Sequence, residues 1–150
     1  SWIDWSLLKK NKELFEFFKF MIAYRKKHPV IRKKLDNAVC GMEGMHAHDV
    51  NADRMEVSQN AKTLAVSFAG YDRKKCKDDL VYVAVNAYWE EVRITLPNLA
   101  NHGAWYLSVD TYGDENGKYC YEEGEEIRID HEYVMKPRSI VVFTGRQVLR

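Results

Sequence analysis

The sequence predicts a mainly β protein: an antiparallel β-sandwich preceded by one amphipathic helix. Two observations support this prediction. Apolar residues recur every three or four positions in the first thirty residues, and after Pro29 they recur every second position. Several short β-type segments then follow one another with no helix between them, which is typical of a sandwich or barrel. The chain has 150 residues, 46% hydrophobic and 13% aromatic, which is enough apolar material for a core.

The helix is expected over residues 11–28. Asn11 is a suitable N-cap and Glu13 lies in the first turn, whereas Arg25 to His28 bring positive charge to the C-terminal end. Pro29 then ends the helix. A separate helical turn is expected over residues 6–10. The buried face would be broad, and it has more apolar surface than one sandwich face needs; its members are Leu14, Phe15, Phe17, Phe18, Met21 and Ile22.

Six strands are predicted from runs of Val, Ile, Leu, Tyr and Phe separated by Gly, Asn, Asp and Pro. They cover residues 65–68, 80–86, 92–96, 105–109, 127–129 and 140–143. Residues 114–117 (DENG) are typical of a hairpin turn. Residues 36–62 have weak periodicity, so we expect an irregular excursion there with one or two strands.

Charge and cysteine content narrow the function classes. The net charge of +1 predicts neither nucleic acid nor a membrane surface as partner. We interpret the basic runs at 26–27, 32–34 and 73–75 and the acidic runs at 122–123 and 125–126 as solvated faces. Cys40, Cys76 and Cys120 are spaced as neither a disulfide framework nor a metal clip, which favours reduced thiols and a cytoplasmic location. No run is long enough for a membrane span, no signal peptide is seen, and the start at Ser1 suggests that the chain begins inside a longer protein.

A search for catalytic groups predicts none. A retaining glycosidase needs two carboxyl groups about 5–5.5 Å apart. The adjacent pairs at 78–79, 90–91, 122–123 and 125–126 would point to opposite faces of a strand, so we interpret them as surface charge. His46 and His48 would share one strand face, but they lack a convincing third ligand, so no metal and no cofactor is predicted. Phosphate-binding loops and a nucleophile elbow are also missing from the sequence.

Aromatic residues are the remaining candidates for a binding site. Flat rings can stack on sugars, and Trp2, Trp5, Tyr88 and Trp89 are the candidate carbohydrate-binding residues. The alternative is ordinary packing. We favour packing in the core or between domains for Trp89 and Trp105, and leave both alternatives open for Trp2 and Trp5.

Two segments resemble a known enzyme family. SWIDWSLLKKNKELFEFFKFMIAYRKKHPVIR (1–32) is similar to the end of the catalytic barrel in isoamylase-type and glycogen-debranching enzymes of the α-amylase superfamily. VYVAVNAYWEEVRITLP (81–97) resembles the C-terminal sandwich of that family, and Trp105, Asp110-Thr111 and Pro137-Arg138-Ser139 follow in the family's order. One departure is Met45-His46-Ala47-His48, which stands where the family often has Phe/Trp-His-Gly followed by Trp.

The resemblance implies a C-terminal α-amylase-type sandwich with Greek-key-like topology. Residues 1–30 would be the last helical segment of a truncated (β/α)8 barrel, and residues 31–150 the sandwich. The family's catalytic carboxylates would lie upstream of Ser1, and His48-Asp49 is a chance match to its late His-Asp motif. We therefore expect a non-catalytic domain that stabilises the catalytic barrel of an α-1,6-debranching glycosidase. The alternatives are a sandwich that itself binds α-glucan through exposed aromatics, and a module whose helix docks on a partner chain.

Overall fold

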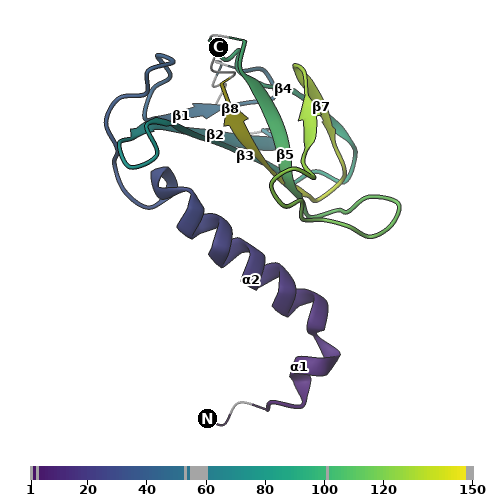
Figure 1. Ribbon diagram of the computed structural model, residues 1–150. Helices are drawn as coiled ribbons and strands as arrows, with labels where there is room; N and C mark the ends of the chain where they lie inside the picture. Colours follow the sequence, from purple (N-terminus) through teal and green to yellow (C-terminus); the bar gives the residue numbers. More distant parts are fainter. Residues whose placement is uncertain (1, 3, 53, 55–60, 101, 148–150) are drawn as a thin grey trace.

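The computed structural model describes residues 2, 4–52, 54, 61–100 and 102–147. Two helices begin the chain, α1 (Leu7–Lys10) and α2 (Lys12–Lys27), followed by the 3-10 turn η1 (Pro29–Ile31). Eight strands follow: β1 (Met45–His48), β2 (Thr63–Asp72), β3 (Lys77–Asn86), β4 (Val92–Thr95), β5 (Ala104–Asp110), β6 (Ile127–Ile129), β7 (Glu132–Met135) and β8 (Ile140–Arg146). The predicted mainly β fold with a preceding helix is confirmed (Figure 1).

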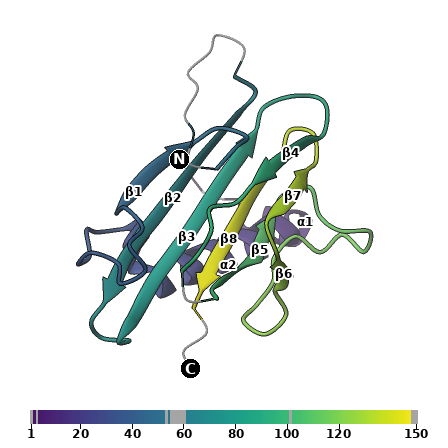
Figure 2. The ribbon, with the colours of Figure 1, turned by 90° about the horizontal axis from the view of Figure 1, so that it is seen from above.

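The strands form two antiparallel sheets. Six strands lie in the order β1-β2-β3-β8-β5-β6, and β4 pairs with β7 in a second, smaller sheet. The last strand therefore lies between β3 and β5, the Greek-key-like crossover that was expected. Seen from above, β4 and β7 cover one face of the large sheet and α2 lies behind the other (Figure 2).

Two hydrophobic clusters hold these layers together. On one face, Ile94 of β4 and Met135 of β7 pack with Tyr82, Trp105 and Phe143 of the large sheet. On the other face, the helical layer packs on alternate residues of the same strands; this second cluster contains Tyr24, Val30, Val81, Val109 and Val142. Because successive strand residues point to opposite faces, β3 supplies both cores.

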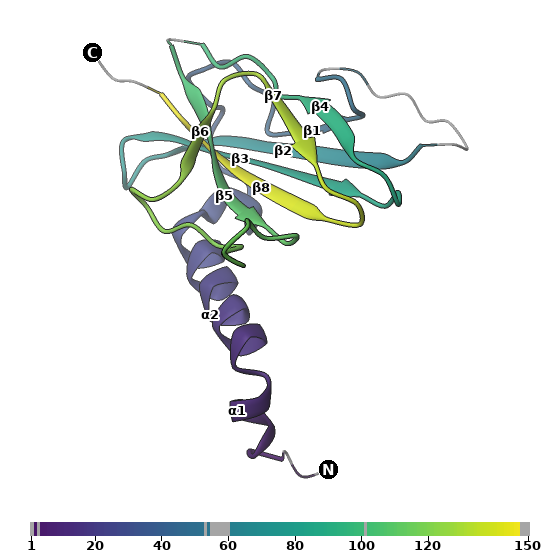
Figure 3. The ribbon, with the colours of Figure 1, turned by 90° about the vertical axis from the view of Figure 1, so that its right-hand side faces the viewer.

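Helix α2 contacts the sheet mainly through its C-terminal half. Its N-terminal half and α1 extend away from the sheet (Figures 1 and 3). The contact nearest its N-terminus is the hydrogen bond that Tyr119 Oη donates to the Glu13 carbonyl at 3.3 Å. Phe17 packs on the same tyrosine, with ring centroids 5.9 Å apart. Asn11 is the N-cap, as expected, but its side chain makes no capping hydrogen bond.

Several boundaries differ from the prediction. β2 and β3 each have ten residues, longer than predicted, because they pair in register along their whole length. β7 was not predicted; its Glu-Tyr-Val-Met sequence has no clear alternation and depends on pairing with β4. The turn at 114–117 forms, with Gly117 at φ +74°. It lies within the β5–β6 connection and returns the chain to an antiparallel bridge between Val109 and Cys120, so it is hairpin-like as predicted. One strand, β1, is found in the 36–62 region, of which 53 and 55–60 lie outside the described residues.

Among the described residues, none of the helices has the length and apolar character that crossing a bilayer requires.

Candidate functional site

The end of α2 is held on the sheet by a buried hydrogen bond between His28 and Asp79. Pro29 ends the helix, and His28 turns into the sheet with Nδ1–H donating to Oδ1 of Asp79 at 2.6 Å. The other carboxylate oxygen of Asp79 accepts from the backbone N–H of Val30 at 3.0 Å. Asp79 and His28 are each 5% exposed. One carboxylate on β3 thus fixes both the helix end and η1.

The prediction that the acidic pairs are surface charges is wrong at two positions. Asp79 is buried by the helix, and the side chain of Glu126 is only 4% exposed and pairs with Arg146. Asp78 accepts from the backbone N–H groups of Val39 and Cys40, both at 2.8 Å. Asp78 and Asp79 therefore bind different backbone segments, as expected for neighbours on a strand.

A buried hydroxyl network lies under the helix. Tyr24 Oη is 2.8 Å from Thr144 Oγ1, which is also 2.8 Å from Ser108 Oγ. Burial raises the pKa of Tyr24 to about 12, so the phenol stays neutral over the usual pH range. The network satisfies polar groups inside the second core and fixes the position of the helix along β8.

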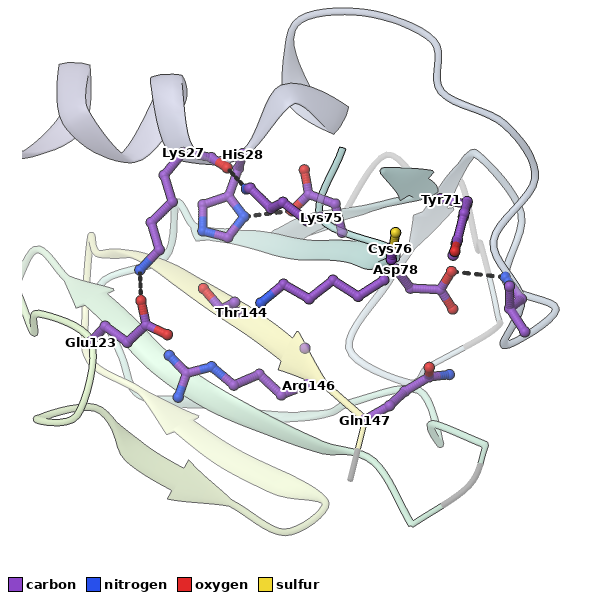
Figure 4. Close-up of a pocket in the computed structure, with 14 residues that line it drawn as sticks. Lys27, His28, Tyr71, Lys75, Cys76, Asp78, Glu123, Thr144, Arg146 and Gln147 are labelled. Carbon is purple, nitrogen blue, oxygen red and sulfur yellow. Dashed lines mark hydrogen bonds and ion pairs between the residues drawn. The ribbon is translucent and has the colours of Figure 1, made fainter. Parts of the chain in front are cut away.

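A pocket of about 440 Å³ opens beside this junction (Figure 4). Its carboxylates are already partnered: Asp79 binds His28, Asp78 caps the backbone at residues 39 and 40, and Glu123 pairs with Lys27 at 2.7 Å. Lys75 Nζ donates to the backbone carbonyl of Lys27. Structural contacts therefore engage all three carboxylates of this pocket.

The two strand histidines lie as the sequence suggested, on one face of β1 with ring centroids 4.8 Å apart. His48 is buried with Nε2 2.9 Å from Ser67 Oγ, and Nδ1 of His46 is 2.9 Å from Glu43. No cluster of three His, Cys, Asp or Glu side chains suited to a metal occurs among the described residues.

The cysteines are free thiols. Burial raises the pKa of Cys40, and burial raises that of Cys120 to about 11, so both thiols are protonated and poorly nucleophilic at neutral pH.

Two of the predicted sugar-binding residues form one aromatic pair, in which Trp89 is exposed and Tyr88 is half-buried. Tyr88 and Trp89 follow β3, with ring centroids 4.2 Å apart and planes inclined by 36°. Asn86 fixes their loop: its Oδ1 accepts from Tyr88 N, and its Nδ2 donates to the Glu90 and Lys136 carbonyls. Core packing is wrong for Trp89, which is 66% exposed, and packing between domains stays a prediction for it; Trp105 is buried as expected.

Trp2 and Trp5 lie near the N-terminus, on the helical segment that extends away from the sheet. Both are highly exposed, and they precede α1 at the free end of the helical segment (Figure 3). The structure does not bring them next to Tyr88 and Trp89, so the four candidates do not make one site.

One face of α2 is apolar and exposed. We call it the outer stripe; its residues are between 47% and 58% exposed, and they are Leu14, Phe15, Phe18 and Ile22. A different face carries the residues packed on the sheet, which are Phe17, Phe20, Met21 and Tyr24. The helix thus has two apolar faces and only one of them is covered by the described residues. The sequence indicated this excess of apolar surface but could not separate the two faces.

Comparison with known proteins identifies the family of the β-sandwich. Residues 33–144 match the family model for the isoamylase C-terminal domain. The chain belongs to this family. No curated protein matches the chain. In the isoamylase C-terminal family the domain is attached to a catalytic domain of the same chain. Helices α1 and α2 lie before the matched region.

Proposed function

We propose that this chain is the non-catalytic C-terminal part of a glycosidase that hydrolyses α-1,6 branch linkages in glycogen or starch. In this proposal residues 1–30 are the last helical segment of the catalytic barrel, and residues 31–150 are the sandwich that stabilises it. Membership of the isoamylase C-terminal family supports the class of the parent enzyme. Three free cysteines favour a cytoplasmic location.

The outer stripe of α2 is the observation that carries the proposal. Water-exposed Leu, Phe and Ile side chains in a row are unfavourable for an isolated domain and mark a surface that packs against another body. The same helix is anchored to the sandwich on its other side through Tyr24 and His28. A helix anchored on one face and apolar on the other is suited to joining two domains rigidly.

A stripe variant measured in two contexts tests this role. Phe18→Asp should change the unfolding free energy of the 150-residue chain by no more than about 0.5 kcal/mol, because Phe18 is already exposed there. In the full-length parent it should cost about 2 kcal/mol or more, since it places a charge in a packed interface. Lys19→Asp, on the charged face of α2, is the matched control; it breaks an exposed pair with Glu16 and should cost no more than about 0.5 kcal/mol in either context.

Equal effects of Phe18→Asp in the two contexts would contradict the barrel contact. Docking on a separate partner chain predicts another result: the variant parent would dissociate into smaller species in sedimentation while its own unfolding transition stayed unchanged.

The absence of catalysis is tested directly. Reducing-end release from glycogen, amylopectin and pullulan by the purified chain should not exceed the buffer rate. Hydrolysis that persists through purification and is lost on unfolding would refute the non-catalytic role.

A second candidate function is direct binding of α-glucan by the sandwich. The observation that favours it is the Tyr88–Trp89 pair with its exposed Trp89 ring, since aromatic faces stack on sugar rings. Lys62 Nζ lies 3.7 Å from the centroid of the Tyr88 ring, so Trp89 is the more open of the two rings. Asn86 holds the loop in place before any ligand arrives, which lowers the entropic cost of binding.

Affinity electrophoresis in glycogen or amylopectin gels measures this binding. Retardation of the chain should fall several-fold in Trp89→Ala, and Val39→Ala, another exposed apolar site, should migrate like the wild type. Trp5→Ala tests the N-terminal ring separately. Wild-type migration unaffected by the glucan would exclude this second function.

A further inference from the structure

Basic residues from two distant parts of the sequence meet at one end of the domain. They are Lys26 at the end of α2, residues 32–34 after η1, and residues 73–75 in the β2–β3 turn. Together they line an open groove of about 720 Å³ whose apolar lining includes Pro29, Leu35 and Tyr71. This volume lies within the ~300–1,000 Å³ range of small-molecule sites.

The charge of this groove is strongly unbalanced. Seven cationic side chains line it against two carboxylates, Asp36 and Asp72, although the whole chain carries a net charge of only +1. Both carboxylates are engaged, because Asp36 pairs with Arg73 and Asp72 lies 3.8 Å from Lys75 Nζ. The other five cations have no ion-pair partner in the described part of the chain: Lys26, Arg32, Lys33, Lys34 and Lys74.

Local structure explains only part of this arrangement. A cation at the C-terminal end of a helix stabilises the helix dipole, which accounts for Lys26. It does not account for the runs at 32–34 and 73–75, which come from other elements. Gathering like charges destabilises a fold through repulsion, so the arrangement indicates a surface adapted to an anion.

The groove is also held in shape without a ligand. Arg32 Nη2 donates to the Lys26 carbonyl at 3.3 Å, and Tyr71 N donates to the Asp36 carbonyl at 2.9 Å. At Gly70, an added Cβ would lie 2.6 Å from Leu35 Cβ, so only glycine lets the segment at 35–36 cross β2 so closely. Both walls are therefore tied to the sheet, which reduces the ordering cost of binding.

We propose that this groove binds phosphate monoester groups carried on a sugar, either a small sugar phosphate or a phosphorylated α-glucan. The guanidinium of Arg32 suits bidentate contact with phosphate oxygens, and the lysines add charge around it. Tyr71 supplies an aromatic surface for the sugar part. The phosphate part rests on the groove alone, and the sugar part rests on the proposed function.

The test titrates the 150-residue chain with glucose 6-phosphate, inorganic phosphate and glucose, followed by amide chemical shifts. Glucose 6-phosphate should bind more tightly than inorganic phosphate, glucose alone should not bind, and the shifts should be confined to residues 26–36 and 70–76. Phosphorylated and unphosphorylated amylopectin, compared in affinity gels, distinguish the polymer from the small sugar phosphate as the source.

Two double variants with the same charge change separate the groove from general charge. Lys33→Glu/Lys34→Glu should weaken glucose 6-phosphate binding at least tenfold, whereas Lys9→Glu/Lys10→Glu on α1 should weaken it less than twofold. Circular dichroism checks that both exposed pairs leave the fold intact.

Any of three results would overturn the proposal. The two double variants could lose the same affinity for glucose 6-phosphate, or the chain could bind inorganic phosphate as tightly as glucose 6-phosphate. A short DNA duplex could also displace glucose 6-phosphate more strongly than a sugar phosphate does. A failure of the proposed function is recognised separately, because the full-length parent would then lack debranching activity whatever the groove binds.

Discussion

The buried pair at the helix–sheet junction supports a quantitative prediction. Asp79→Ala removes two buried hydrogen bonds, one from His28 Nδ1 at 2.6 Å and one from Val30 N at 3.0 Å. Hydrogen bonds to a charged group contribute about 1.5–3 kcal/mol each. We therefore expect a loss of about 4 kcal/mol in unfolding free energy.

Urea unfolding followed by the fluorescence of buried Trp105 measures this loss. In a chain of this size, 1 kcal/mol corresponds to about 2–4 °C, so the melting temperature should fall by roughly 10 °C. Asp79→Asn keeps an acceptor for Val30 N and should lose about half as much. Hydrogen exchange at Val30 should accelerate in Asp79→Ala, because its amide loses its only acceptor among the described residues.

Asp130→Ala is the control, since Asp130 is exposed and its contact with Arg128 is 3.7 Å long. It should change stability by less than about 0.5 kcal/mol. If Asp79→Ala also stayed within that range, the pair would contribute nothing net and the argument for a rigid helix anchor would be refuted.

Three further predictions concern the two cores and the crossing at β2. Tyr24 has a pKa raised to about 12, above its unfolded value, so its stabilising effect is complete below about pH 10 and is lost as the pH rises towards 12. Tyr24→Phe should flatten that part of the stability–pH curve, and an unchanged alkaline slope would contradict this. Gly70→Ala should lower the unfolding free energy by about 1–3 kcal/mol, because the added Cβ would clash with Leu35. Gly44→Ala is the control: its added Cβ would lie 3.8 Å from the nearest atom, so the loss should be under about 1 kcal/mol. Equal urea midpoints for the two variants would contradict the close contact between Gly70 and Leu35. Trp105→Phe should lower the unfolding free energy by about 2–4 kcal/mol, because it removes side-chain volume from the core and the 2.7 Å hydrogen bond from Trp105 Nε1 to the Pro97 carbonyl. A urea midpoint equal to that of the wild type would contradict this prediction.

Strongly periodic segments were predictable because their pattern is local. The helix ends at Lys27 before Pro29, and β2, β3, β5 and β8 contain the predicted runs. Their apolar side chains must leave water whatever the topology, so the period alone indicates the element. β7 was missed because four residues with a mixed pattern become a strand only when β4 lies beside them.

For the candidate site residues too, local pattern predicted some properties and only the tertiary contacts decided others. Exposure of Trp89 and burial of Asp79 both depend on which element covers a given strand face, and no local pattern specifies that. Adjacent acidic residues look alike in sequence, yet Asp79 meets the end of a helix whereas Glu90 remains exposed.

By itself the sequence determined the mainly β class, the amphipathic helix ending at Pro29, and the resemblance to the isoamylase family, because these depend on residue types at short spacings. Only the tertiary structure decided which helix face is covered, which carboxylate is buried, and that basic runs some forty residues apart share one groove. The reason is physical: periodicity and propensity act between neighbours in the chain, whereas burial and charge act between neighbours in space.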